Sequence, residues 1–125
     1  MRDALLALGG TAVVLLPGNL EPESLNQRIL EQCAKESTGQ SFTIRDANEI
    51  KSVDLQPCEC HYNCVKLYYA TGGSLKVFTG YALTEDGLWR HHSWCRHDVN
   101  PEEIWESTVE RLMYVGVETS SPAEL

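Results

Sequence analysis

The sequence predicts an α+β protein in which two main helices pack on an antiparallel sheet of four to five strands. Apolar residues recur at helical spacing in two segments, and they alternate in two further segments joined by Asp86-Gly87, a strong hairpin-turn signal. The chain has 125 residues, 42% of them hydrophobic and 22% charged, which is enough for one hydrophobic core. We therefore expect a single domain over residues 1–125.

Short local patterns define the first elements. Residues 1–8 predict either a short helix or a frayed end, because Gly9-Gly10 breaks the pattern. The β-branched apolar run at 11–16 predicts a buried strand that ends at Pro17-Gly18.

The first main helix is predicted to begin at Pro22 and to stop at Gly39. Its apolar face carries Leu25, Ile29, Leu30 and Cys33. We expect Cys33 to be an ordinary core residue on this face. Residues 40–46 alternate and predict a strand, and residues 47–56 predict a loop or a short turn of helix.

The second main helix is predicted over residues 60–71 and is closed by Gly72-Gly73. Alternating segments at 74–84 and 88–97 then predict the two strands of the hairpin around Asp86-Gly87.

The length of the hairpin loop sets which residues face each other. A two-residue loop would place Tyr81 opposite His92, whereas a three-residue loop would place Gly80 there. Neighbouring strand residues point to opposite faces, so His92 and Trp94 share one face, and Cys95 and His97 share the other.

Two predictions compete for the segment after this hairpin. Asn100-Pro101-Glu102-Glu103 is a good helix start, and apolar residues then repeat at helical spacing. Alternatively, residues 104–108 form a short third strand after a turn at 98–103. Residues 119–125 predict a solvated tail.

Charge and cysteine content limit the classes of partner. The net charge of −8 and the pI of about 4.9 argue against nucleic acid, because phosphate binding needs a basic surface. Five cysteines are an odd number, so we expect free thiols in a reducing compartment. The apolar run at 4–18 is too short to span a bilayer. We therefore expect a cytoplasmic protein without a membrane partner.

The segment Cys58-Glu-Cys60-His-Tyr-Asn-Cys64 contains three of the five cysteines and includes the start of the second main helix. A thiol at the start of a helix is chemically distinctive, because the free backbone N–H groups and the helix dipole favour the thiolate. Nucleophilic thiol catalysis also needs a histidine that takes the proton and a group that orients the histidine.

Four short motifs supply a cysteine, a histidine and an acid in chain order: Cys60-His-Tyr-Asn, Thr79-Gly80-Tyr81-Ala82, His92-Ser93-Trp94 and Glu106-Ser107-Thr108. Together they resemble the transglutaminase-like and papain-like superfamily of thiol enzymes, and the resemblance covers about residues 57–108. They also look like segments of small uncharacterised bacterial proteins. The chain departs from the family pattern in carrying Glu106 where that pattern has Asp.

The resemblance implies a cysteine-protease-like core and a role for each matched residue. Cys60 would be the nucleophile, His92 the base and Glu106 the orienting acid, and Tyr81 and Trp94 would contact the substrate. The reaction would be acyl transfer or amide hydrolysis on a peptide or small amide, with no cofactor. The backbone N–H of Cys60 would help to hold the oxyanion.

Two other interpretations remain open. In the first, zinc is bound by the sulfur and imidazole groups of Cys58, Cys60, His61, Cys64, Cys95 and His97. Cys95 and His97 lie on the strand face opposite to His92, so the face that meets the cysteine cluster would separate zinc from thiol chemistry. In the second, the chain is a non-catalytic binding domain whose aromatic residues line a pocket.

Overall fold

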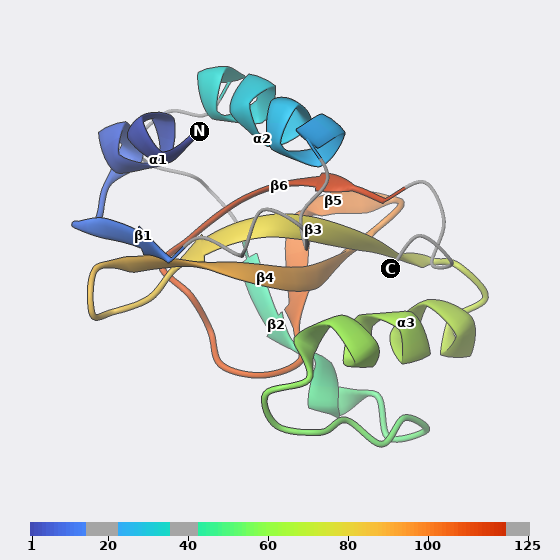
Figure 1. The fold of residues 1–125 in the computed structure, drawn as a ribbon. Helices are drawn as coiled ribbons and strands as arrows, with labels where there is room; N and C mark the ends of the chain where they lie inside the picture. Colours follow the sequence, from blue (N-terminus) through green and yellow to red (C-terminus); the bar gives the residue numbers. More distant parts are fainter. Residues whose placement is uncertain (15–22, 36–42, 120–125) are drawn as a thin grey trace. The chain divides into compact units, whose positions relative to one another are not determined.

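A computed structural model describes residues 1–14, 23–35 and 43–119 of the chain (Figure 1). Its helices are α1 (Arg2–Leu8), α2 (Glu23–Lys35) and α3 (Cys60–Ala70), with a short 3-10 helix η1 (Ala47–Glu49). Its strands are β1 (Ala12–Val14), β2 (Thr43–Asp46), β3 (Leu75–Leu83), β4 (Leu88–His97), β5 (Asn100–Glu106) and β6 (Met113–Glu118). The predicted ends at 15–18, 22 and 39 and the tail at 120–125 lie outside the described residues.

The predicted α+β class is confirmed, but the predicted sheet is wrong in strand number and direction. Six strands form a mixed sheet in the order β2-β5-β4-β3-β6, with β1 paired with β4. The pairs β1–β4 and β2–β5 are parallel, whereas β4–β5 is antiparallel. Alternation identifies a strand but not its partner. The parallel strands pair with segments far away in the sequence, where no local turn indicates their direction.

Contacts divide the chain into two compact units, which we describe separately. Unit 1 consists of Met1–Gln40, Gly80–His91 and Arg111–Val117, and unit 2 consists of Ser41–Thr79, His92–Glu110 and Glu118–Leu125. The strands β3 and β4 each contribute residues to both units.

Unit 1 packs the helices α1 and α2 side by side (Figure 1). Its core consists of Leu5, Ile29, Cys33, Tyr81, Leu83, Trp89 and Val115. Cys33 is therefore a core residue, as its helical spacing predicts. Gly80 is required where β3 approaches β6, because a Cβ atom there would lie 2.1 Å from the C=O oxygen of Val115.

The hairpin between β3 and β4 closes with the longer of the two predicted loops. The N–H of Thr84 donates to the C=O of Leu88 at 3.0 Å, which leaves three residues in the loop. Gly87 ends this loop with a φ of 84°, a conformation that favours glycine.

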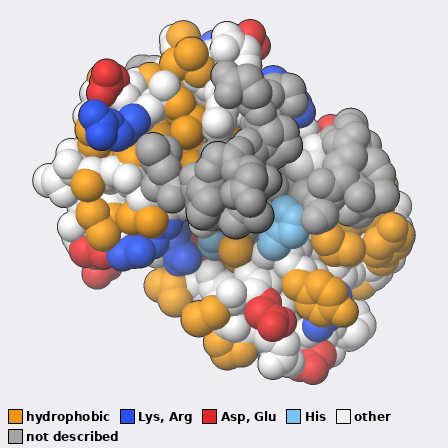
Figure 2. Space-filling model, in the orientation of Figure 1, with side chains coloured by type: hydrophobic (Ala, Val, Ile, Leu, Met, Phe, Trp, Pro, Cys, Tyr) orange, Lys and Arg blue, Asp and Glu red, His pale blue; other side chains and the backbone are white. Residues whose placement is uncertain are grey.

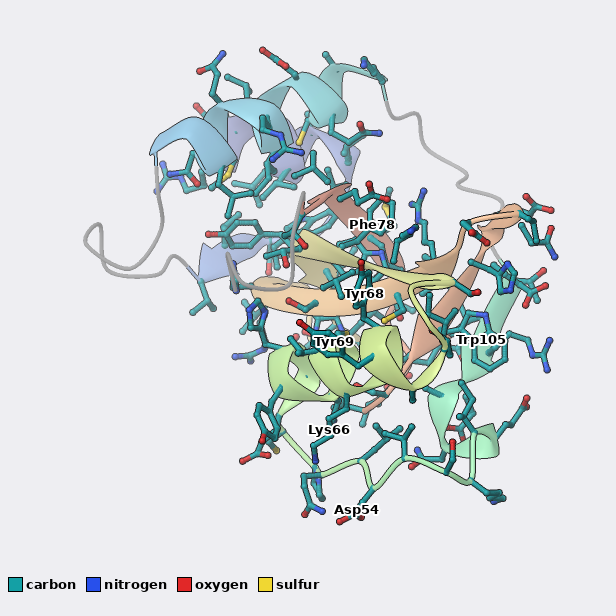
Figure 3. The ribbon with its side chains drawn as sticks, turned by 90° about the vertical axis from the view of Figure 1, so that its right-hand side faces the viewer. Asp54, Lys66, Tyr68, Tyr69, Phe78 and Trp105 are labelled. Carbon is teal, nitrogen blue, oxygen red and sulfur yellow. The ribbon has the colours of Figure 1, made fainter. Side chains whose placement is uncertain are left out.

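Unit 2 packs α3 against the first half of β3 and the second half of β4. Its core consists of Ala47, Cys64, Leu67, Leu75, Val77 and Cys95. The helix ends at Ala70, and the chain turns away from it at Gly72 and Gly73, which have φ values of 63° and 87°. The neighbouring loop is tied to the helix by Lys66, which extends toward Asp54 and donates to its C=O at 2.8 Å (Figure 3).

The segment after the hairpin is a strand and not a helix, but the predicted bounds are wrong. The strand begins at Asn100, inside the predicted turn at 98–103, and ends at Glu106, before the predicted end at 108. Ile104 of β5 is fully buried and pairs with Ile44 of β2 on one side and with Arg96 of β4 on the other. Two neighbouring strands stabilise the extended backbone more than the helix-start residues at its beginning favour a helix.

The described surface is chemically mixed. On the face in Figure 2, hydrophobic, acidic and basic side chains occur in separate small groups. Among the helices of the described residues, none is both long and apolar enough to cross a membrane.

Candidate active site

The start of α3 positions the Cys60 thiol. Cys60 is the first residue of this helix, and the side chain of the preceding residue, Glu59, makes no capping hydrogen bond. The Cys60 thiol is partly exposed and is hydrogen-bonded to the side chain of His92 and to the backbone of Ser93. The helix start and the strand β4 thus meet at this sulfur atom.

A carboxylate holds the other side of the His92 ring. Nε2 of His92 lies 2.8 Å from Oε1 of Glu106, and both side chains are only 3% exposed. Since Nε2 is hydrogen-bonded to Glu106, Nδ1 is the ring nitrogen that is available to Cys60. The antiparallel pairing of Cys95 with Trp105 brings the end of β5 beside β4, which places Glu106 within reach of His92.

The residue Thr108 fixes the second oxygen of the carboxylate. Both the backbone N–H and the hydroxyl of Thr108 donate to Oε2 of Glu106, each at 3.1 Å. The structure therefore brings Cys60, His92 and Glu106 together in one hydrogen-bonded series, with the imidazole between the thiol and the carboxylate.

Hydrogen bonds outweigh burial in setting the pKa of the thiol and of the imidazole. Burial is the largest single influence on the Cys60 thiol, and it raises the pKa. The hydrogen bond to His92, the charge of His92 and the hydrogen bond to the Ser93 backbone together lower the pKa of Cys60 below 9.0. Burial is also the largest influence on His92 and lowers its pKa, but the bonds to Cys60 and Glu106 raise it above 6.5. Both shifts favour a thiolate beside a protonated imidazole.

A second network lies beside the thiol and was not predicted. Nδ1 of His61 lies 2.7 Å from the Ser93 hydroxyl, which is also 3.1 Å from the hydroxyl of Thr79. This network holds the residue whose backbone contacts Cys60. The residues of this network all belong to the four sequence motifs: His61, Thr79 and Ser93. The sequence does not indicate which group a serine or threonine hydroxyl will hydrogen-bond to.

The two predicted substrate-contact residues are fully buried. Tyr81 belongs to the core of unit 1 and meets the ring of His91 edge-on at 5.6 Å. Trp94 stacks on His92, with ring centroids 6.0 Å apart. Their burial gives no support to direct contact with a substrate. The contact that the structure does show is the packing of the Trp94 ring against the His92 imidazole.

The six residues predicted as zinc ligands are divided among several places in the structure. The free thiols of Cys64 and Cys95 are both buried and hydrogen-bonded to each other. This hydrogen bond, followed by burial, raises the pKa of Cys64 well above 9.0. Cys58 is exposed, and His97 lies 3.4 Å from Asp98. Within residues 1–14, 23–35 and 43–119, no group of three or more His, Cys, Asp or Glu side chains is placed to hold a metal ion.

The prediction that strand parity would separate the two chemistries is wrong. The helix α3 meets Cys95 through Cys64, and it also meets His92 through Cys60. The strand β4 is paired with β5 from Cys95 to His97, and His92 lies outside this paired part of β4. In this part of β4, the Cys60 sulfur contacts the backbone of Ser93 as well as the side chain of His92, so its contacts are not limited to one face of the strand.

An open depression of about 400 Å³ adjoins the thiol. It is lined by Cys58, Glu59, Cys60, His61 and Tyr62. A small acyl group could therefore approach Cys60 from solvent. Comparison with protein-family models, curated proteins and solved structures gave no match.

Proposed function

We propose that this chain is a cysteine-dependent acyltransferase or amide hydrolase that uses Cys60, His92 and Glu106. The observation that supports it most is the bridging imidazole, which is hydrogen-bonded to the Cys60 thiol and lies 2.8 Å from the Glu106 carboxylate. The proposal agrees with the resemblance of the motifs to transglutaminase-like and papain-like enzymes.

In the proposed reaction, His92 takes the proton of the Cys60 thiol, and the thiolate attacks the carbonyl carbon of an amide. The C–N bond then breaks, the leaving amine takes the proton from His92, and a thioester remains on Cys60. Water or a second amine attacks the thioester, gives a proton to His92 and releases the acyl group from sulfur.

The helix start supplies a donor for the developing oxyanion. The first intrahelical hydrogen bond runs from the N–H of Asn63 to the C=O of Glu59 at 2.9 Å. The backbone N–H of Cys60 precedes this bond and lies next to the reacting sulfur.

The proposed chemistry uses only the side chains and the backbone of this chain, so we propose that it requires no cofactor. The open depression suits a peptide or a small amide as the acyl donor. All five cysteines are free thiols, which agrees with work in a reducing compartment such as the cytoplasm.

Acylation by p-nitrophenyl acetate tests the proposal, because this activated ester needs no specific recognition. We expect an acetyl thioester on Cys60 in peptide mass maps, and release of nitrophenol that continues after one equivalent. His92→Asn should slow the acylation by about 10²–10⁴-fold.

Cys58→Ser is the matched control, because Cys58 lines the same depression but has no histidine partner among the described contacts. This variant should react like the wild type. Equal acetylation of Cys58 and Cys60, or no effect of His92→Asn, would remove the basis of the proposal.

A further inference from the structure

The side chain of Asn63 is a fully buried polar group beside the thiol site that takes no part in the proposed chemistry. Asn63 lies on α3, three residues after Cys60, and is 0% exposed. Its carboxamide pairs with both backbone groups of Gln56. Oδ1 accepts from the N–H of Gln56 at 2.9 Å, and Nδ2 donates to the C=O of Gln56 at 2.8 Å.

The same amide also reaches the strand that carries the acid. Nδ2 of Asn63 donates to the hydroxyl of Ser107 at 3.3 Å, and Ser107 directly follows Glu106. Ser107 is itself only 5% exposed. One side chain therefore joins the segment that enters α3, the helix α3 and the end of β5.

These bonds close a ring around the site. One side runs from Cys60 through His92 to Glu106, and the other returns from Glu106 through Ser107 and Asn63 to the helix that carries Cys60. An imidazole is rigid, so His92 can bond to both partners only if they are held at one separation. Hydrogen bonds just outside a reacting group commonly hold such a separation.

We propose that Asn63 is a positioning residue of the thiol site, which acts through Ser107 to hold the Cys60 thiol and the Glu106 carboxylate at the separation that one imidazole spans. This inference rests on the proposed function. Asn63 touches no substrate, and its effect is on the ionisation of Cys60 through the geometry of His92 and Glu106.

Ser107→Ala tests the inference, because it removes the bond to Asn63 and leaves the pairing of Asn63 with Gln56 intact. We expect the midpoint pH for alkylation of Cys60 by iodoacetamide to move up toward 9.0, the ordinary pKa of a cysteine. The rate near pH 7 should fall about fivefold, as expected for the loss of one hydrogen bond. Ser107→Thr keeps a hydroxyl and should restore most of the wild-type profile.

Val77→Ala is the control for a general loss of stability. Val77 belongs to the core of unit 2, and its aliphatic side chain has no atom that could hydrogen-bond to the site. It should lower the stability and leave the alkylation midpoint unchanged. Asn63→Ala should shift the midpoint in the same direction as Ser107→Ala, provided that circular dichroism shows it to be folded.

Two failures can be told apart. If His92→Asn leaves the reactivity of Cys60 unchanged, the proposed function fails and the inference fails with it. If His92→Asn slows alkylation but Ser107→Ala has the same midpoint as Val77→Ala, only the positioning role of Asn63 is overturned.

Discussion

Replacing Glu106 with Gln tests the electrostatics of the site with almost no change of shape. One carboxylate oxygen of Glu106 lies 2.8 Å from Nε2 of His92, and the other accepts two hydrogen bonds from Thr108 at 3.1 Å. Glutamine has one oxygen, so it keeps either the bond to His92 or the bonds to Thr108. It also carries no charge to balance a protonated ring.

The size of the effect follows from the bond that is weakened. A hydrogen bond to a charged group contributes roughly 1.5–3 kcal/mol to stabilising that charge, which corresponds to about 10- to 150-fold. We therefore expect the alkylation rate of Cys60 near pH 7 to fall by about this factor, because a neutral imidazole stabilises the thiolate less. The charge of Glu106 itself raises the pKa of Cys60, but it is the smallest of the influences on this thiol.

The assay is the rate of iodoacetamide labelling of Cys60 between pH 5 and pH 9, measured by mass spectrometry in a Cys58→Ser background. Glu110→Gln is the matched control, since Glu110 is exposed in the same segment. Equal labelling rates for Glu106→Gln and Glu110→Gln would refute the reasoning.

Four further predictions follow from other parts of the structure. Limiting iodoacetamide near pH 7 should label Cys60 before Cys33, Cys64 and Cys95, because these three are buried and the pKa of Cys64 is raised; peptide mapping checks the order. Leu67→Ala should lower the free energy of unfolding in urea by about 2–5 kcal/mol, whereas Val109→Ala, at a side chain that is 70% exposed, should change it by less than about 0.5 kcal/mol. Gly80→Ala should destabilise by about 1–3 kcal/mol or abolish folding, because the new Cβ would meet the Val115 backbone; a wild-type melting curve would contradict this. Finally, the pKa of His92 is raised in the folded state, so its contribution to stability is complete below pH 6.5 and is lost as pH rises through the folded pKa. His92→Asn should therefore destabilise more at pH 6 than at pH 9, and an equal loss at both would speak against the shift.

Local chemistry was sufficient to predict most of the elements. The alternation around Asp86-Gly87 predicted β4 with the bounds Leu88–His97, and the glycine pair at 72–73 predicted the end of α3. The resemblance of the four motifs to thiol enzymes also pointed to Cys60, His92 and Glu106, three side chains that lie together in the structure.

Long-range pairing could not be read in the same way. The apolar pattern around Ile104 suits a helix as well as a strand. Only the pairing of Ile104 with β2 and β4 shows that the segment is a strand. The strand β1 pairs with β4 across more than half of the chain, and nothing near Ala12 indicates a parallel partner.

The side-chain amide of Asn63 illustrates the limit for the site. The residue stands in the Cys60-His-Tyr-Asn motif, but its three hydrogen bonds go to Gln56 and Ser107. A buried amide is recognisable only once the groups that satisfy it are known, because its spacing from Cys60 also suits a solvent-exposed helical residue.

Ultraviolet absorbance of the thiolate gives the ionisation of Cys60 without any reagent. The signal is the difference between the wild type and Cys60→Ser during a pH titration, measured again in a His92→Asn background. We predict a wild-type midpoint below 9.0 that moves upward when His92 is replaced. A midpoint that is the same with and without His92 would contradict an imidazole that bridges this thiol and the Glu106 carboxylate.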